Sequence, residues 1–292
     1  MRSGTCCIVV VMNKKSSTTL VDSMLVFDID GVLTDPRTTK FNKTLLERIS
    51  ADLQKGVPVA LNTGRQTQWV FEKLLPHLQG RVSAQDLDHL LLVAEKGGVR
   101  VEFDTKSAEP RVVEDREVAL PDQYMTELSK FLEVAADDNT LFDHYVRWDT
   151  GKRTVASFEK LPEVSMEEFE RVRGRLYEHI ELFLEQHGLS EFHIDESITA
   201  TDVEHQKAGK HKGAEQILNW LKKRGERIGQ FYSFGDTPSD ETMAAVFAQH
   251  AKSIFVYVGI KALPENQHSQ HERVVMRGRF DADAAEYLTQ IS

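Results

Sequence analysis

Short apolar segments that end in polar or acidic residues alternate with segments of helical spacing. The first, Met24 to Ile29, is almost wholly apolar, as expected for a strand buried on both faces. Strand-like segments at 57–62 and 90–94 follow, and helix-like segments at 44–54 and 66–78 separate them. Strand, helix, strand order implies right-handed crossovers and a parallel sheet. We therefore predict an α/β fold with a Rossmann-like core.

The same alternation resumes only in the last third of the chain. Helices are expected at 212–223 and 241–247, and strands at 230–234 and 253–258. Between the two halves lie two charged helical segments, 121–136 and 165–187, each followed by strand-like residues: 141–149 and 154–159 after the first, 191–199 after the second. This pattern predicts an α+β module inserted into the core. The expected limits are 24–118 and 202–292 for the core, 119–201 for the inserted domain, and 1–23 for a poorly ordered extension.

Composition excludes several classes of protein. The 292 residues carry a net charge of −10 with no basic cluster, which argues against a nucleic-acid partner. The apolar run Cys6 to Met12 is too short to span a bilayer, where about 20 residues are needed, so no membrane partner is expected. The two cysteines, Cys6 and Cys7, are adjacent and cannot staple a fold. We expect a reduced, cytoplasmic protein.

Chemically capable residues follow the ends of the expected strands, where ligands bind in open parallel sheets. They are Asp28 and Asp30, the run Thr63, Gly64, Arg65, the pair Lys212, Gly213 at a helix start, and the run Gly235 to Asp240. Each alone is as well explained as a helix cap or turn. Together they place carboxylates, a hydroxyl and an amine at one sheet edge. Such carboxylates need a cation, and Mg²⁺ suits an all-oxygen set. With a lysine and a hydroxyl, they predict a phosphoryl-binding site.

These stretches resemble the four motifs of the haloacid dehalogenase superfamily of phosphohydrolases. The matching segments, in the family's order, are DIDGVLT from Asp28, LNT ending at Thr63, KG at Lys212 and GDTPSD from Gly235. The resemblance covers most of 24–115 and 205–292. It implies a Mg²⁺-dependent phosphomonoester hydrolase acting on a small phosphorylated metabolite, with a sugar phosphate favoured. A phosphomutase and a non-catalytic relative that binds a phosphorylated ligand are the alternatives.

The resemblance also implies a role for each matching residue. Asp28 is expected to be the nucleophile and Asp30 the acid and base, with Thr63 and Lys212 holding phosphoryl oxygens. Mg²⁺ would be held by Asp28, the main-chain carbonyl of Asp30 and Asp236, with Asp240 acting directly or through water. Ser239 stands where relatives commonly have Asn. Lys207 and Lys210 lie near Lys212, and the following Gly213 favours Lys212 as the motif lysine.

The position and content of the insert resemble the C2-type cap, of the type IIB branch that includes sugar-phosphate phosphatases. Specificity is then expected to depend on the cap. Candidates are on the expected hairpin, where snorkelling surface cations are the plainer interpretation of each residue taken alone. The expected substrate-binding residues are Thr63, Gly64, Arg65, Lys96, Arg147, Lys152 and Arg153, and His144 and Trp148 on the same hairpin are further candidates for contact with the leaving group. The sequence leaves open whether the chain forms a homodimer.

Overall fold

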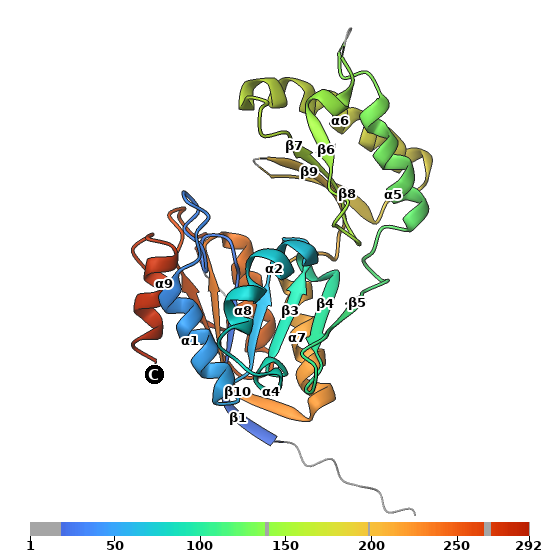
Figure 1. Ribbon diagram of the computed structural model, residues 1–292. Coiled ribbons are helices and arrows are strands. Elements are labelled where there is room, and N and C mark those ends of the chain that lie inside the picture. Colours follow the sequence, from blue (N-terminus) through green and yellow to red (C-terminus); the bar gives the residue numbers. More distant parts are fainter. Residues whose placement is uncertain (1–18, 138–139, 198, 266–269, 292) are drawn as a thin grey trace, which may run out of the picture.

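The computed structural model describes residues 19–137, 140–197, 199–265 and 270–291. Within them the chain forms a large core and a smaller domain that stands beyond one end of the core sheet (Figure 1). The expectation for residues 1–18 of the N-terminal extension lies outside the described residues. Residues 19–23, expected to belong to that extension, are the start of the first core strand.

The core is built on a sheet that has eight strands among the described residues, in the order β12-β11-β10-β1-β2-β3-β4-β5. Neighbours from β12 to β3 are parallel, and β4 and β5 add an antiparallel edge. The strands are β1 (Thr19–Phe27), β2 (Val59–Asn62), β3 (Leu90–Ala94), β4 (Val99–Phe103), β5 (Pro110–Glu114), β10 (Glu226–Gly235), β11 (Lys252–Tyr257) and β12 (Glu272–Val275).

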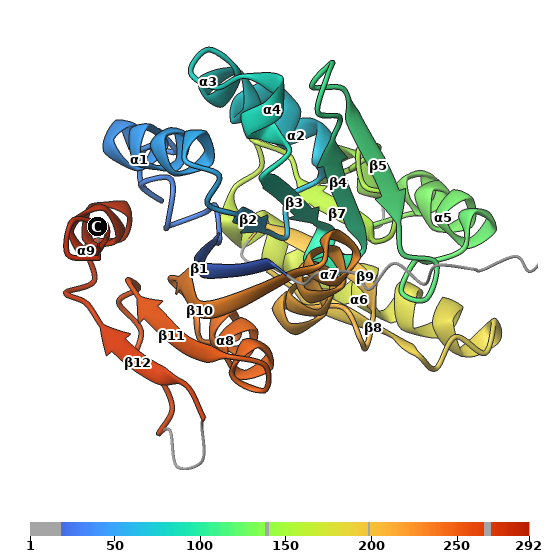
Figure 2. The ribbon, with the colours of Figure 1, turned by 90° about the horizontal axis from the view of Figure 1, so that it is seen from below.

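Helices cover both faces of this sheet (Figure 2). Alternate residues of β1 show why, since Leu25 and Phe27 pack in one apolar cluster whereas Met24 and Val26 pack in another. The first cluster lies under α1 and α9, and the second lies under α7 and α8. The core helices are α1 (Lys43–Gln54), α2 (Thr67–Lys73), α3 (Leu75–Gln79), α4 (Ala84–Leu87), α7 (Lys210–Arg224), α8 (Glu241–Ala248) and α9 (Asp281–Leu288), with 3-10 turns η1 (Glu95–Gly97) and η4 (Pro238–Asp240).

The inserted domain is an antiparallel sheet covered by helices, with its own apolar core. Its strand order is β6-β7-β9-β8, and the buried face of α6 packs against it through Phe169, Val172 and Leu176. Figure 1 shows that this domain faces the carboxyl ends of the parallel strands, and we call it the cap. Its elements are α5 (Asp122–Ser129), α6 (Met166–Gln186), β6 (Val146–Trp148), β7 (Ala156–Lys160), β8 (Phe192–Glu196) and β9 (Ala200–His205), with η2 (Lys130–Glu133) and η3 (Phe142–His144).

The predicted α/β core with an α+β insert is confirmed, and the differences are local. The strand β9 runs to His205 and pairs with β7 and β8, so the second domain boundary follows His205 instead of preceding residue 202. The helix expected at 66–78 is divided at Leu74 into α2 and α3, because Pro76 in the first turn of α3 has no N–H to continue the ladder. The strand expected at 141–149 shortens to β6, preceded by η3. Among the described residues, no helix is both long and apolar enough to cross a membrane.

Candidate active site

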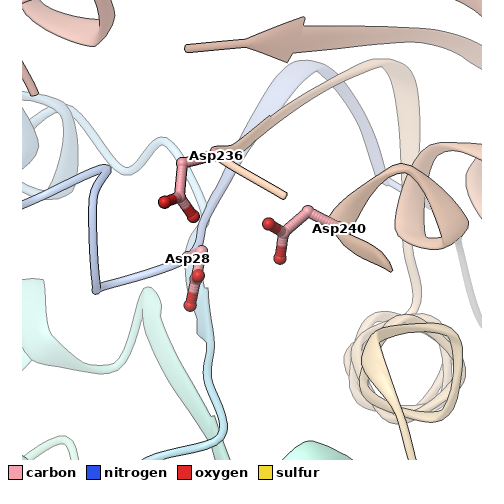
Figure 3. Close-up of side chains that lie close together, drawn as sticks. All are labelled: Asp28, Asp236 and Asp240. Atoms are coloured by element: carbon pink, nitrogen blue, oxygen red, sulfur yellow. The ribbon is translucent and has the colours of Figure 1, made fainter. Parts of the chain in front are cut away.

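Three carboxylates meet where the central strands of the core sheet end. Asp28 follows β1, Asp236 follows β10, and Asp240 is the last residue of η4, directly before α8. One oxygen from each lies within 4.8 Å of the others, and Figure 3 shows the three side chains close together. Asp28 and Asp240 are buried and Asp236 is half-buried. Close, desolvated carboxylates of this kind are the hard oxygen ligands that suit Mg²⁺.

The turn after β1 brings Asp28 and Asp236 together through Gly31. This residue has a φ of +74°, which glycine adopts without steric cost. A Cβ at this position would lie 2.3 Å from Oδ2 of Asp236, so any side chain would displace that carboxylate. The Asp-Ile-Asp-Gly sequence therefore supplies both an acid and the space for a second acid.

A lysine on the first turn of α7 completes the cluster. The Nζ atom of Lys210 lies 2.6 Å from Oδ1 of Asp28 and 2.7 Å from Oδ1 of Asp240, and it donates to the main-chain oxygen of Asn62 at 2.8 Å. Burial disfavours its positive charge, but the carboxylates of Asp240 and Asp28 outweigh burial and raise the pKa of Lys210. The ammonium is therefore held charged between two carboxylates.

With Lys210 as their cation, the ionised forms of the carboxylates in this cluster are disfavoured by burial and by mutual repulsion. Burial raises the pKa of Asp28 to about 8, with Asp240 adding to the rise and Lys210 opposing it. Burial, followed by repulsion from Asp240, raises the pKa of Asp236 to about 6. A divalent cation would favour the ionised forms of both. Asp28, Asp236 and Asp240 thus fit a magnesium ion by ligand type, spacing and unmet charge.

The structure corrects the choice of the motif lysine from Lys212 to Lys210. Successive helix residues are about 100° apart, so two positions separate these side chains by about 200°. Lys212 accordingly points away from Asp28 and pairs with Asp115 at 3.2 Å and with Glu117 at 3.1 Å. Lys207 also pairs with Glu117, at 2.5 Å. Lys212 and Lys207 therefore tie the two chain segments that connect core and cap.

Asp30 lies at the edge of the site and engages Arg65. Both carboxylate oxygens accept from the guanidinium, at 2.9 Å each, and that guanidinium is also 4.7 Å from the ring centre of Trp69. The carboxylate of Asp30 is therefore not a member of the three-acid cluster, which leaves its main-chain carbonyl as the expected metal contact. Thr63 is fully buried, and its Oγ1 accepts the backbone N–H of Arg65.

A cleft of about 640 Å³ separates the cap from this edge of the core. Gly64, Arg65, Lys96, Arg147 and Lys152, all expected to bind substrate, line it. They are joined by residues that the sequence did not single out. These include Gln66, Trp69, Asp149, Glu159, Asp195 and Asp202, none of which carries a motif that could have identified it. A second hollow of about 680 Å³ lies near the start of β10, at the opposite end of the sheet from the carboxylates.

Two of the expected cap contacts lie elsewhere. The guanidinium of Arg153 pairs with Glu114 at 3.2 Å and is not part of the cleft lining. Its backbone N–H and that of Thr154 instead donate to the buried carboxylate of Glu95, each at 2.8 Å, which fastens the cap to η1 of the core. His144 is exposed and contacts the neighbouring Asp143. The sequence predicts a longer hairpin than the structure contains, and this difference explains why Arg153 and His144 are expected at the cleft but lie outside its lining.

Comparison with solved structures identifies the architecture. A haloacid dehalogenase-like hydrolase from Bacteroides thetaiotaomicron superposes with a TM-score of 0.59 over 93% of this chain and 100% of that chain, at 12% identity. The chain has the capped haloacid dehalogenase fold. Aspergillus fumigatus trehalose-6-phosphate phosphatase is similar over 92% of both chains, with a TM-score of 0.52 and 13% identity. Truncated Plasmodium falciparum IMP-nucleotidase has a TM-score of 0.53 over 92% of this chain and 70% of that chain, at 14% identity. No protein-family model and no curated protein matches the sequence.

Proposed function

We propose that this chain is a Mg²⁺-dependent phosphomonoester hydrolase that acts on a small phosphorylated metabolite, a sugar phosphate, through an aspartyl-phosphate intermediate. The observation that carries the proposal is the cluster of Asp28, Asp236 and Asp240 around Lys210, at the sheet edge that faces the cap. A nucleophile, a cation site and a fixed positive charge are then within reach of one phosphoryl group.

In the first half-reaction, a carboxylate oxygen of Asp28 attacks phosphorus. A bond forms between Asp28 and phosphorus, and the bond from phosphorus to the leaving oxygen breaks. Asp30 gives its proton to that leaving oxygen, so the product departs as an alcohol. Lys210 and Thr63 hold the phosphoryl oxygens while their negative charge is redistributed.

In the second half-reaction, water attacks phosphorus while Asp30 accepts the proton of that water. The bond between phosphorus and Asp28 then breaks, which returns Asp28 as a carboxylate and releases inorganic phosphate. This role requires Asp30 to turn from Arg65 toward the substrate, and its partly exposed side chain has the freedom to do so. Mg²⁺ held by Asp28, Asp236, Asp240 and the carbonyl of Asp30 would neutralise phosphoryl charge.

The substrate class is supported by the cleft and by two structural neighbours. The cleft presents carboxylates together with Trp69 and Trp148, and such groups bind the hydroxyls and the apolar faces of sugars. One neighbour is named a trehalose-6-phosphate phosphatase, which favours a sugar phosphate. The other is named an IMP-nucleotidase, so nucleoside monophosphates belong in any substrate screen. A phosphomutase would return the phosphoryl group to a second hydroxyl, whereas a non-catalytic relative would only bind its ligand.

The test is hydrolysis of an aryl phosphate, with Mg²⁺ and with a chelator, by wild type and Asp28→Asn. Asp22→Asn is the matched control, because it makes the same change on an exposed residue of β1, the strand that leads to Asp28, outside the site. We expect Mg²⁺-dependent turnover in wild type and Asp22→Asn, and its loss in Asp28→Asn. Equal rates in wild type and Asp28→Asn would refute the hydrolase assignment. A sugar-phosphate and nucleotide panel, repeated with a sugar bisphosphate activator, separates hydrolysis from phosphoryl return.

A further inference from the structure

The cleft between core and cap contains many charges but offers little positive charge to a ligand. Four cationic side chains and five carboxylates line it. The cations are Arg65, Lys96, Arg147 and Lys152, and the acids are Asp30, Asp149, Glu159, Asp195 and Asp202. The lining that meets the leaving group therefore has an excess of negative charge.

Each of these four cations, among the described residues, already has a carboxylate partner. Two pairs lie at the sides of the cleft, where Arg147 binds Glu159 at 2.6 and 3.0 Å and Arg65 binds both oxygens of Asp30. The proposed mechanism releases Arg65 when Asp30 turns to the substrate, whereas the other three cations keep their partners. The third cation is Lys96, which lies 2.5 Å from Asp195 and 2.6 Å from Glu204 of the cap.

The fourth pair is built into the cap sheet. Lys152 contacts both oxygens of Asp202, at 3.0 and 3.1 Å, and also donates to Ser157. Ser157 in turn donates to Asp202 at 2.5 Å. The side chains of Lys152 and Asp202 are only 10% and 8% exposed, so this pair is desolvated and its members cannot turn to bulk water. Separating it for a ligand would leave a buried carboxylate without its partner.

The fifth acid, Asp149, is held by neutral donors. The backbone N–H of Gly151 donates to it at 2.9 Å, and the Gln66 amide approaches it at 3.5 Å across the gap between core and cap. Asp149 therefore adds a negative charge to the cleft, and no guanidinium or ammonium of the described residues forms an ion pair with it. A hydroxyl of a ligand can donate to such an oxygen, whereas an anion would be repelled.

We infer that the cleft selects substrates with one phosphate and an uncharged, hydroxyl-bearing leaving group, and rejects substrates that carry a second phosphate or a carboxylate. The inference rests on the proposed function for the location of the phosphate, which binds beside Lys210. It goes further by assigning selectivity to the carboxylates that neutralise Lys96, Arg147 and Lys152. Glu159 and Asp202 are the specificity residues. Each is paired with a cation, Arg147 or Lys152, that a second anionic group on the substrate would need as its partner.

The test compares sorbitol 6-phosphate with 6-phosphogluconate, which differ only by a hydroxymethyl group against a carboxylate. We expect kcat/KM to be at least tenfold higher for sorbitol 6-phosphate than for 6-phosphogluconate, and the affinity measured by calorimetry to differ by at least the same factor. This preference should decrease as the salt concentration rises. Glu159→Gln should free Arg147 and reduce the preference at least threefold. Glu181→Gln, which removes the same charge from the exposed face of α6, should leave it unchanged.

Equal or better use of 6-phosphogluconate by the wild type would overturn the inference, even with Mg²⁺-dependent hydrolysis intact. The inference would also be overturned if Glu181→Gln reduced the preference as much as Glu159→Gln does, because long-range charge alone would then explain the preference. Absence of aryl phosphate turnover would refute the proposed function, while the two calorimetric affinities would still decide the selectivity. Asp202→Asn, checked by thermal melting, provides a second variant in which Lys152 is freed.

Discussion

Replacing Lys210 or Lys212 by Met tests which lysine serves the site. The two residues lie two positions apart on α7, and their side chains are 11% and 10% exposed, so the substitutions are matched in chemistry and burial. Lys210 contacts two carboxylates of the cluster at 2.6 and 2.7 Å. Removing one preorganised group that stabilises transition-state charge costs roughly 10²- to 10³-fold in kcat, or about 2.7–4 kcal/mol. We expect that loss for Lys210→Met.

Lys212→Met should change kcat by about threefold or less, because its partners are Asp115 and the exposed carboxylates of Glu117 and Glu215, which lie outside the cluster, and ion pairs with exposed groups contribute about 0–1 kcal/mol. The assay is steady-state hydrolysis of an aryl phosphate at saturating Mg²⁺, with circular dichroism melts to verify that both variants are folded. A large loss for Lys212→Met with near-normal activity of Lys210→Met would refute the assignment of Lys210 and restore the sequence-based choice.

Three further results are expected. Mg²⁺ affinity should rise with pH from about 6 to about 8 and then level off, because burial raises the pKa of Asp28 to about 8 and of Asp236 to about 6 and bound Mg²⁺ must displace their protons. Calorimetry in two buffers would detect the released protons, and pH-independent affinity would contradict the reasoning. Gly213→Ala should destabilise the fold by roughly 1–3 kcal/mol and lower activity, because its Cβ would lie 2.1 Å from Oδ1 of Asn62. Gly174→Ala, in a helix with no atom within 4 Å of the new Cβ, should instead stabilise by about 0.5–1 kcal/mol, and urea titrations that ranked the two alike would contradict the packing argument.

The sheet and its acidic edge were predictable because they depend on local pattern. Asp28 and Asp236 each follow a strand whose buried residues are mostly apolar, and parallel strands present their carboxyl ends at one edge. The positions of Lys96 and Arg65 in the cleft followed from the same reasoning. In each case the residue lies within three positions of the end of a strand and is placed by that strand.

The lysine and the cap contacts were not predictable in this way. Choosing between Lys210 and Lys212 requires the rotation of α7 about its axis, which depends on packing of Gly213 against Asn62. The partners of Lys152 and Arg147 come from strands that pair across the cap sheet. The register between strands that are distant in the sequence cannot be predicted from either segment alone. The sequence indicated which residue types were available, whereas their pairing arose from tertiary packing.

The first turn of α7 carries both Lys210, in the carboxylate cluster, and Lys212, bound to Glu117 on a segment leading to the cap. Lys207, immediately before this turn, holds the same glutamate from the returning segment. Glu117 is therefore paired with lysines on both sides of the residue whose ammonium lies in the carboxylate cluster. Three lysines within six residues thus join the carboxylate cluster of the core to the segments that lead to and from the cap.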